Sequence, residues 1–188
     1  NNRSGLSEAV KVALVKDGVF FDWLEENVEG LNALEPAALE EAVERSAILH
    51  ARHIALGGDP FETGSSRPLD FGHWTAHKME QLTDFELSHA DAVSVGVALD
   101  TLYSARCGWL SEEDAWRAVG LLQSLQLPVW HESLELRDEQ GRRLVYRGLE
   151  EFREHLGGEP TVLMLEGVGQ GADRHSVDES LHEACIDE

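Results

Sequence analysis

The segment at residues 88–106 is apolar or small on nearly every side, and no other feature constrains the fold as strongly. It reads SHADAVSVGVALDTLYSAR, with alanine, valine or leucine at 90, 92, 93, 95, 97, 98 and 99. A helix that is hydrophobic all round must be buried, because it has no polar face to turn toward water. We therefore predict a central helix at 88–106 that other helices must surround.

Helical patterns continue on both sides of this segment. Apolar residues between 6 and 28 recur at helical spacing, and Gly18 divides them into two predicted helices. Pro36 suits a first helical turn and begins an amphipathic helix that ends before Gly57. Gly, Ser, Pro and Asp are frequent at 57–72, which predicts an irregular loop. Further helices are predicted at 73–82, at 112–127 after the N-cap Ser111, at 148–156 and at 177–185.

The pattern changes near the C-terminus. Residues 129–146 alternate in polarity around Asp-Glu-Gln-Gly at 138–141, which predicts a hairpin, and a strand is predicted at 161–165. The GVGQG sequence at 167–171 resembles half of a dinucleotide fingerprint, but no βαβ unit surrounds it, so a turn is favoured. The chain is thus predicted to be mainly α, with a small β element near its C-terminus.

The charge balance limits the possible partners. The chain has 36 acidic and 15 basic residues and a net charge of −21. Nucleic acid and anionic membrane surfaces are disfavoured, because neutralising phosphates needs clustered lysine and arginine. A small phosphorylated substrate is still possible, since two or three local cations can hold it.

Two further features favour a cytoplasmic protein. Cys107 and Cys185 form no disulfide framework and no CxxC motif, which suits a reducing compartment. No apolar stretch is long enough to span a bilayer, and the first residues lack the apolar core of a signal peptide.

The densest group of chemically active residues lies between 70 and 91. His73 and His77 are four apart at a predicted helix start, and His89 begins the next helix. A helix–turn–helix pair can bring these imidazoles together, and a catalytic zinc needs three protein ligands, commonly histidine and a carboxylate. The spacing alone leaves open an ordinary helix with two histidines on one face, because the HExxH glutamate is absent.

Three motifs in order resemble the dehydroquinate synthase-like sugar phosphate cyclases. Residues 67–80, RPLDFGHWTAHKME, resemble the family's arginine, LNFGH and second histidine before an acid. Residues 89–96, HADAVSVG, resemble its HGEAVxxG helix, and residues 4–11, SGLSEAVK, resemble its NGxAEVIK motif. The resemblance covers essentially the whole chain, more loosely beyond residue 110, and implies the helical C-terminal domain of that fold.

The resemblance also implies roles for individual residues. Glu8, His73 and His89 would be the metal ligands, for Zn²⁺ or Co²⁺. The catalytic group would comprise Lys11, His77, Arg67 and Asp70, and the substrate would be contacted by Arg52, Glu62, Arg153 and His155. Without the rest of the pattern, Glu8 and Lys11 would be read as an exposed helix ion pair.

Several positions depart from the dehydroquinate synthase pattern. Asp70 replaces the asparagine before FGH, Arg52 takes the place of a lysine, and Arg153 and His155 stand where the family has a lysine pair. Asp70 and His155 look more like the relatives that cyclise sedoheptulose 7-phosphate to valiolone-type products. His77, by contrast, is the residue that dehydroquinate synthases have at this position. The resemblance therefore leaves open whether the substrate is that of dehydroquinate synthase or sedoheptulose 7-phosphate.

The reaction implied by the resemblance is a sugar phosphate cyclisation. Tightly held NAD oxidises an alcohol of a seven-carbon sugar phosphate, phosphate leaves, the hydride returns, and an intramolecular aldol reaction closes a carbocycle. The family binds NAD in an N-terminal domain, so residues 1–188 are expected to be only the C-terminal metal- and substrate-binding domain of a homodimeric lyase. The alternative is a helical interaction domain that has lost catalysis.

Overall fold

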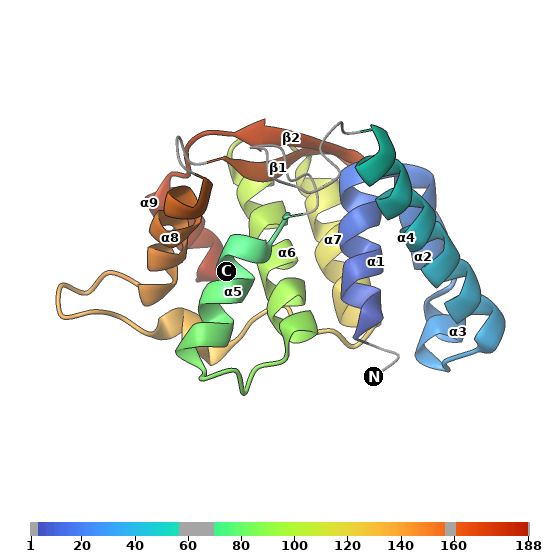
Figure 1. The fold of residues 1–188 in the computed structure, drawn as a ribbon, viewed down its shortest axis with the longest axis horizontal. Helices are drawn as coiled ribbons and strands as arrows, with labels where there is room; N and C mark the ends of the chain where they lie inside the picture. Colours follow the sequence, from blue (N-terminus) through green and yellow to red (C-terminus); the bar gives the residue numbers. More distant parts are fainter. Residues whose placement is uncertain (1–3, 57–69, 157–160, 188) are drawn as a thin grey trace.

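The structure, a computed structural model, describes residues 4–56, 70–156 and 161–187, and the side chains at 54, 56 and 152–156 lie outside that description. It is mainly helical with one two-stranded sheet, which confirms the predicted fold class (Figure 1). The described elements are α1 (Gly5–Lys16), α2 (Gly18–Glu26), α3 (Val28–Asn32), α4 (Pro36–Leu56), α5 (His73–Leu82), α6 (His89–Arg106), α7 (Glu112–Ser124), the 3-10 turns η1 (Glu132–Glu135) and η2 (Leu144–Tyr146), α8 (Arg147–Leu156), β1 (Val162–Gly167), β2 (Gln170–Arg174) and α9 (Glu179–Ile186).

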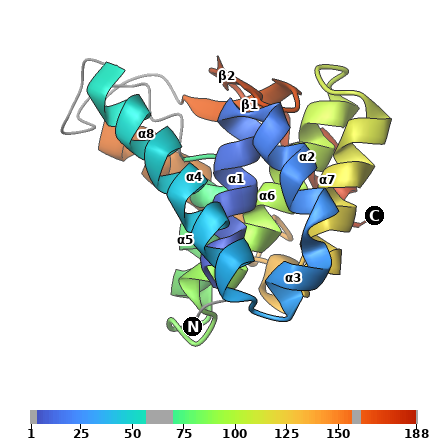
Figure 2. The same ribbon diagram turned by 90° about the vertical axis from the view of Figure 1, so that its right-hand side faces the viewer.

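Helix α6 runs through the middle of the molecule, as predicted from its sequence. Its N-cap is Ser88, whose hydroxyl accepts a hydrogen bond from the Asp91 backbone amide. Helices α1, α5, α7 and α9 and strand β1 all pack against it (Figures 1 and 2). Consecutive residues from Ala92 to Thr101 are buried, so no side of this stretch faces water.

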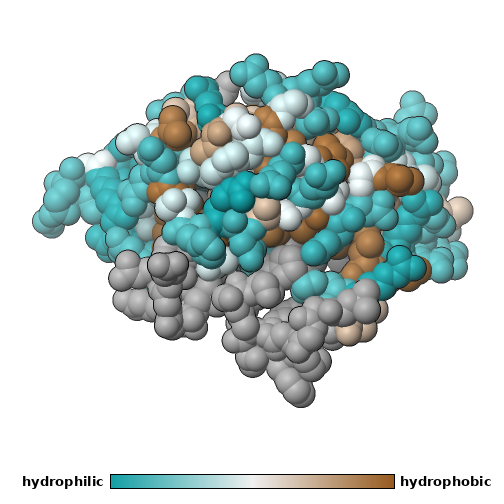
Figure 3. Space-filling view, turned by 90° about the horizontal axis from the view of Figure 1, so that it is seen from above, coloured by the Kyte–Doolittle hydropathy of each residue, from teal (hydrophilic) through white to brown (hydrophobic). Residues whose placement is uncertain are grey.

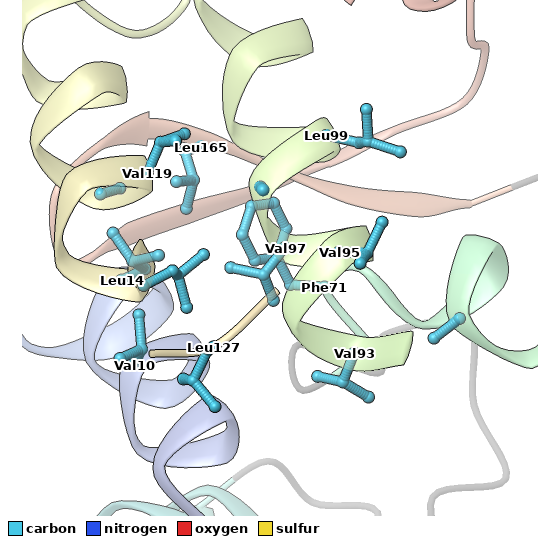
Figure 4. Close-up of a cluster of buried hydrophobic side chains, with 14 of the residues drawn as sticks. Val10, Leu14, Phe71, Val93, Val95, Val97, Leu99, Val119, Leu127 and Leu165 are labelled. Atoms are coloured by element: carbon cyan, nitrogen blue, oxygen red, sulfur yellow. The ribbon is translucent and has the colours of Figure 1, made fainter. Parts of the chain in front are cut away.

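The apolar core forms between α6 and its neighbours (Figure 4). It draws side chains from α1, α6, α7 and β1 and from the turn before α5. Labelled members in the figure are Val10, Leu14, Phe71, Val93, Val95, Val97, Leu99, Val119, Leu127 and Leu165. Because distant segments meet here, burying this core fixes the positions of α1, α5 and α6 relative to one another.

The turn before α5 presses directly on α6. Gly72 has a φ of 76°, a conformation that favours glycine, and it lies against Gly96. A Cβ atom on Gly96 would fall 2.0 Å from the Gly72 carbonyl oxygen, and one on Gly72 would fall 2.5 Å from the Val97 nitrogen. The two glycines therefore allow a backbone-to-backbone approach that no larger residue permits.

The break predicted at Gly18 in the first helical region falls at Asp17. This residue is extended, and its carboxylate caps α2 by accepting a hydrogen bond from the Phe20 amide at 3.0 Å. The pattern up to residue 28 thus yields α1 and α2, with the short α3 following. The amphipathic helix predicted from Pro36 is α4, which packs on α1.

The prediction of a hairpin at 129–146 is correct for its turn and wrong for its strands. The turn at 138–141 forms, with Gly141 at a φ of 84°, but only one isolated bridge pairs Arg137 with Arg143, between η1 and η2. The buried Arg143 guanidinium explains the interruption, because it bonds to the Leu134 carbonyl at 2.8 Å and pairs with carboxylates from η1 and α9.

The sheet lies further along the chain. The strand predicted at 161–165 is confirmed as β1, and it pairs antiparallel with β2, which was not predicted. The turn predicted within 167–171 is confirmed, with Gly169 at a φ of 80°. The exposed, polar pattern of β2 explains why hydrophobic alternation did not indicate it.

The outer surface matches the acidic composition. The coloured part of the face seen from above is largely hydrophilic, with apolar residues scattered among polar ones (Figure 3). Among the described residues, none of the helices combines the length and apolar character that crossing a bilayer requires.

The glycine contact gives a direct test of the packing. Replacing Gly96 with alanine should lower the free energy of unfolding by at least about 2 kcal/mol, because the added methyl would displace the Gly72 carbonyl. Gly120 on α7 is the matched control, since a Cβ there meets no atom within 4 Å. Gly120→Ala should stabilise the chain by about 0.5–1 kcal/mol in urea denaturation. Equal effects of the two substitutions would contradict this account.

Candidate metal centre

Three helix starts converge on one point. Glu8 lies in the first turn of α1, His73 is the first residue of α5, and His89 is the first residue of α6. One ligand atom from each lies within 4.8 Å of the other two. The structure therefore brings together the three residues predicted to bind metal, across segments that are far apart in the sequence.

His73 is oriented by the backbone of its own turn. Its Nδ1 lies 3.1 Å from the Phe71 carbonyl oxygen, an acceptor, so Nδ1 carries the hydrogen. Its Nε2 then presents a lone pair to Glu8 Oε1, 3.9 Å away. Two electron-pair donors that face each other across such a gap leave space for a cation between them.

Burial keeps this imidazole neutral. Burial, helped by the nearby Lys11 ammonium, lowers the pKa of His73 to about 4 against the opposing effects of the Phe71 carbonyl and Glu8. A neutral imidazole is the form that binds metal, so at neutral pH no proton must leave His73 first.

His89 is oriented by Glu80. The Glu80 carboxylate oxygen Oε2 lies 3.1 Å from His89 Nδ1 and 3.0 Å from His77 Nδ1, so it accepts hydrogen bonds from both rings. Burial raises the pKa of Glu80, but the hydrogen bonds from the two histidines outweigh it and the pKa is lowered. This arrangement leaves Nε2 of His89 available and matches the carboxylate–histidine pairs that orient metal ligands.

The three imidazoles form a compact triangle, with every pair of ring centroids 5.5 Å apart. His77, Glu80 and His89 make a second geometrically possible ligand set, which shares His89 with the first. We assign Glu80 as a hydrogen-bond acceptor instead, because its Oε2 lies at hydrogen-bond distance from both Nδ1 atoms, and this pairing leaves the Nε2 of His89 for the first ligand set.

Lys11 pairs with Glu8 at the edge of the centre. The ammonium lies 2.6 Å from Glu8 Oε2 and is almost wholly buried. Burial raises the pKa of Glu8, but the Lys11 charge and hydrogen bond, together with His73 and His89, lower it overall. Glu8 is therefore ionised, which is the state a metal ligand requires.

A cavity of about 270 Å³ opens beside this pair, between α1 and α4. Its lining residues are Glu8, Lys11, Val12, Ser46, Ala47 and His50. The cavity can hold a small polar molecule next to the Lys11 ammonium and the Glu8 carboxylate.

The other predicted site residues are only partly described. His77 is 55% exposed and forms one corner of the triangle, and Asp70 is half-buried, with its carbonyl accepting from the His73 amide at 2.9 Å. Arg52 is exposed near the end of α4. Glu62 and Arg67 lie outside the described residues, and so do the side chains of Arg153 and His155 in α8.

Two residues of the site were not assigned a role from the sequence. Glu80 stands three positions after His77 on the same helical face, so its spacing was a usable signal. His50 lines the cavity only because α4 packs on α1, a tertiary contact that no local pattern reveals.

The family follows from comparison with known proteins. Residues 5–144 match the family model described as 3-dehydroquinate synthase C-terminal. The chain is 39% identical over 127 residues to the 3-dehydroquinate synthase of Pseudomonas putida, covering 67% of this chain and 34% of the relative. It is 32% identical over 184 residues to that of Acinetobacter baumannii, covering 97% of this chain and 49% of the relative. This chain belongs to the 3-dehydroquinate synthase C-terminal family and spans at most about half the length of these curated relatives.

Solved structures agree on the fold. ValA, a 2-epi-5-epi-valiolone synthase from Streptomyces hygroscopicus solved with NAD⁺ and Zn²⁺ bound, superposes with a TM-score of 0.82 at 25% identity. The match covers 98% of this chain and 50% of ValA. A 2-deoxy-scyllo-inosose synthase, solved with carbaglucose-6-phosphate, NAD⁺ and Co²⁺, gives a TM-score of 0.68 at 20% identity over 99% of this chain and 52% of that one, which shows the shared fold alone.

The role of Glu80 can be measured through metal affinity. Glu80→Gln should weaken zinc binding by about 10–100-fold, because the neutral amide oxygen is a weaker acceptor for the two Nδ1–H groups than the carboxylate oxygen Oε2, to which both now bond. Competition titration against a chelator would measure the change. Glu44→Gln is the control, because it removes the same negative charge at an exposed position on α4, and it should bind zinc as tightly as the parent does. Parent-like affinity in Glu80→Gln would contradict the assigned role.

Proposed function

We propose that this chain is the metal- and substrate-binding domain of an NAD-dependent sugar phosphate cyclase. The observation that carries the proposal is the convergence of Glu8, His73 and His89, with each histidine's Nδ1 occupied by an acceptor. The family membership and the fold shared with two sugar cyclases support it. The NAD-binding part of such an enzyme would be a separate N-terminal domain.

The donor set suits a divalent transition metal. Two neutral imidazoles and one carboxylate are a common catalytic zinc set and also suit cobalt. Three protein ligands leave a position open for a substrate oxygen. When bound, such an ion lowers the pKa of the alcohol to be oxidised and polarises the carbonyl that forms.

The protein's own side chains would bind and orient the substrate. The Lys11 ammonium, which lines the cavity beside Glu8, is placed to hold a carboxylate or hydroxyl oxygen of the sugar. His77 donates from Nδ1 to Glu80, so its exposed Nε2 can accept a proton from the substrate and return it. Arg67, Asp70 and the substrate contacts Arg52, Glu62, Arg153 and His155 remain proposals from the motifs.

The substrate class is a seven-carbon sugar phosphate, and two family members are candidates. A 3-dehydroquinate synthase-like lyase is favoured by the curated relatives and by His77. A sedoheptulose 7-phosphate cyclase is favoured by Asp70 and His155 and by the similarity to ValA. We further propose, from the family resemblance, a homodimer that acts in the cytoplasm.

Metal binding is the first measurement. The chain should bind one equivalent of Zn²⁺ or Co²⁺ in calorimetric titration. His73→Ala removes a ligand itself. It should therefore lower the affinity by more than the roughly 10–100-fold that follows when a residue hydrogen-bonded to a ligand is lost. His175→Ala, an exposed histidine after β2, is the matched control and should leave the affinity unchanged. An undiminished affinity in His73→Ala would refute the proposed ligand set, and no binding by the parent would favour the non-catalytic interaction domain.

Activity requires the NAD-binding half. A chimera that joins the N-terminal half of the Pseudomonas putida relative to this chain should release inorganic phosphate from a seven-carbon sugar phosphate, with NAD and zinc present. Sedoheptulose 7-phosphate and the 3-dehydroquinate synthase substrate should be compared side by side, because the preferred one decides between the two candidates. Glu8→Gln in the same chimera is the control and should release none. A folded chimera that binds both metal and NAD but releases no phosphate from either sugar would contradict the proposal.

A further inference from the structure

We propose that Asp100 is a positioning residue for the metal centre, which holds the turn that carries His73. The inference rests on the proposed metal centre and extends it to a residue that no motif includes. Asp100 lies on α6, the helix that begins with the ligand His89, but it is several turns away from that end.

Asp100 is a buried carboxylate that accepts hydrogen bonds from both sides of His73. Its side chain is 1% exposed. Oδ2 accepts from the Gly72 backbone amide at 3.0 Å, and Oδ1 accepts from the Trp74 indole Nε1–H at 3.3 Å. The residues immediately before and after His73 are therefore both anchored to this one carboxylate.

The far side of the carboxylate is closed by α9. His182 is fully buried, and its Nε2 lies 3.5 Å from Asp100 Oδ1. The other ring nitrogen of His182, Nδ1, lies 3.2 Å from the Tyr146 hydroxyl. Among the described residues, no lysine or arginine lies within 4.0 Å of Asp100, so His182 is its one neighbour that can carry a positive charge.

A role in packing alone does not explain this choice of residue. Burying a carboxylate is costly unless donors compensate it, and an apolar side chain of similar size would fill the space at lower cost. The two N–H groups that compensate Asp100 belong to Gly72 and Trp74, the residues on either side of His73. The carboxylate is therefore matched to that turn rather than to the surrounding core.

One rigid helix thus fixes two of the three ligands. Helix α6 carries His89 at its start, touches the turn through Gly96, and bonds to the turn through Asp100. The glycine contact sets how closely the turn approaches, and the carboxylate sets how it is rotated. If the Asp100 bonds are lost, the turn can rotate, and His73 Nε2 moves relative to Glu8 and His89.

The test separates positioning from stability. Asp100→Asn keeps the size of the side chain and removes its charge, and it should raise the Kd for Co²⁺ by about tenfold or more and alter the cobalt ligand-field spectrum. Leu122→Ala is the control, because Leu122 is fully buried on α7, which carries no residue of the centre. It should lower the Tm of the metal-free chain at least as far and keep the Kd within about twofold of the parent.

Each outcome decides the question. A parent-like Kd and spectrum in Asp100→Asn, or an equal loss of affinity in Leu122→Ala, would overturn the positioning role while the parent's binding still upheld the metal centre. A parent that binds no cobalt would refute the metal centre itself, and this inference with it. Should Asp100→Asn not fold, Trp74→Phe keeps a ring and removes one donor. A folded Trp74→Phe with weakened cobalt binding supports the role, and one with parent-like binding overturns it.

Discussion

The close approach of Gly72 to Gly96 is the constraint on which the rest of the structure depends. It lets the backbone before α5 touch the middle of α6, and it brings the Gly72 amide within reach of the buried Asp100. Without it α5 would stand further from α6, and His73 could not share a point with a ligand from α6 and one from α1. The candidate metal centre thus depends on this one backbone contact together with the core that holds α1 and α6.

The charges at the centre bear on how so acidic a chain would receive the proposed anionic sugar. Glu8 and Glu80 are ionised, Lys11 offsets one of them, and the buried His73 is neutral, so these four side chains together carry a charge of about minus one. A divalent ion would reverse that sign. The acidic composition disfavours large polyanions, while a loaded centre would attract a small one.

The sequence predicted the parts of this molecule that depend on local patterns. The all-round apolar segment identified α6, and the spacing of the histidines, with the family motifs, selected the residues that the structure brings together. The prediction of strands at 129–146 was wrong because the Arg143 guanidinium joins η1 to α9. An alternation of polar and apolar residues does not indicate such a contact. The cavity beside Lys11 and the partners of Asp100 depend on how distant helices pack, so no local pattern could indicate them.

The C-terminal helix has a place in this scheme that its sequence does not suggest. It lies beyond residues 5–144, where the family model matches, yet His182 closes the pocket around Asp100. Arg143 holds α9 in place through Glu183 and Asp187, and its guanidinium is itself buried. Support for the turn that carries His73 therefore extends from α6 through Asp100 and His182 to the end of the chain. The candidate metal ligands come from the first half of the chain and their support reaches to its last described helix, so the final geometry of the centre includes the docking of α9.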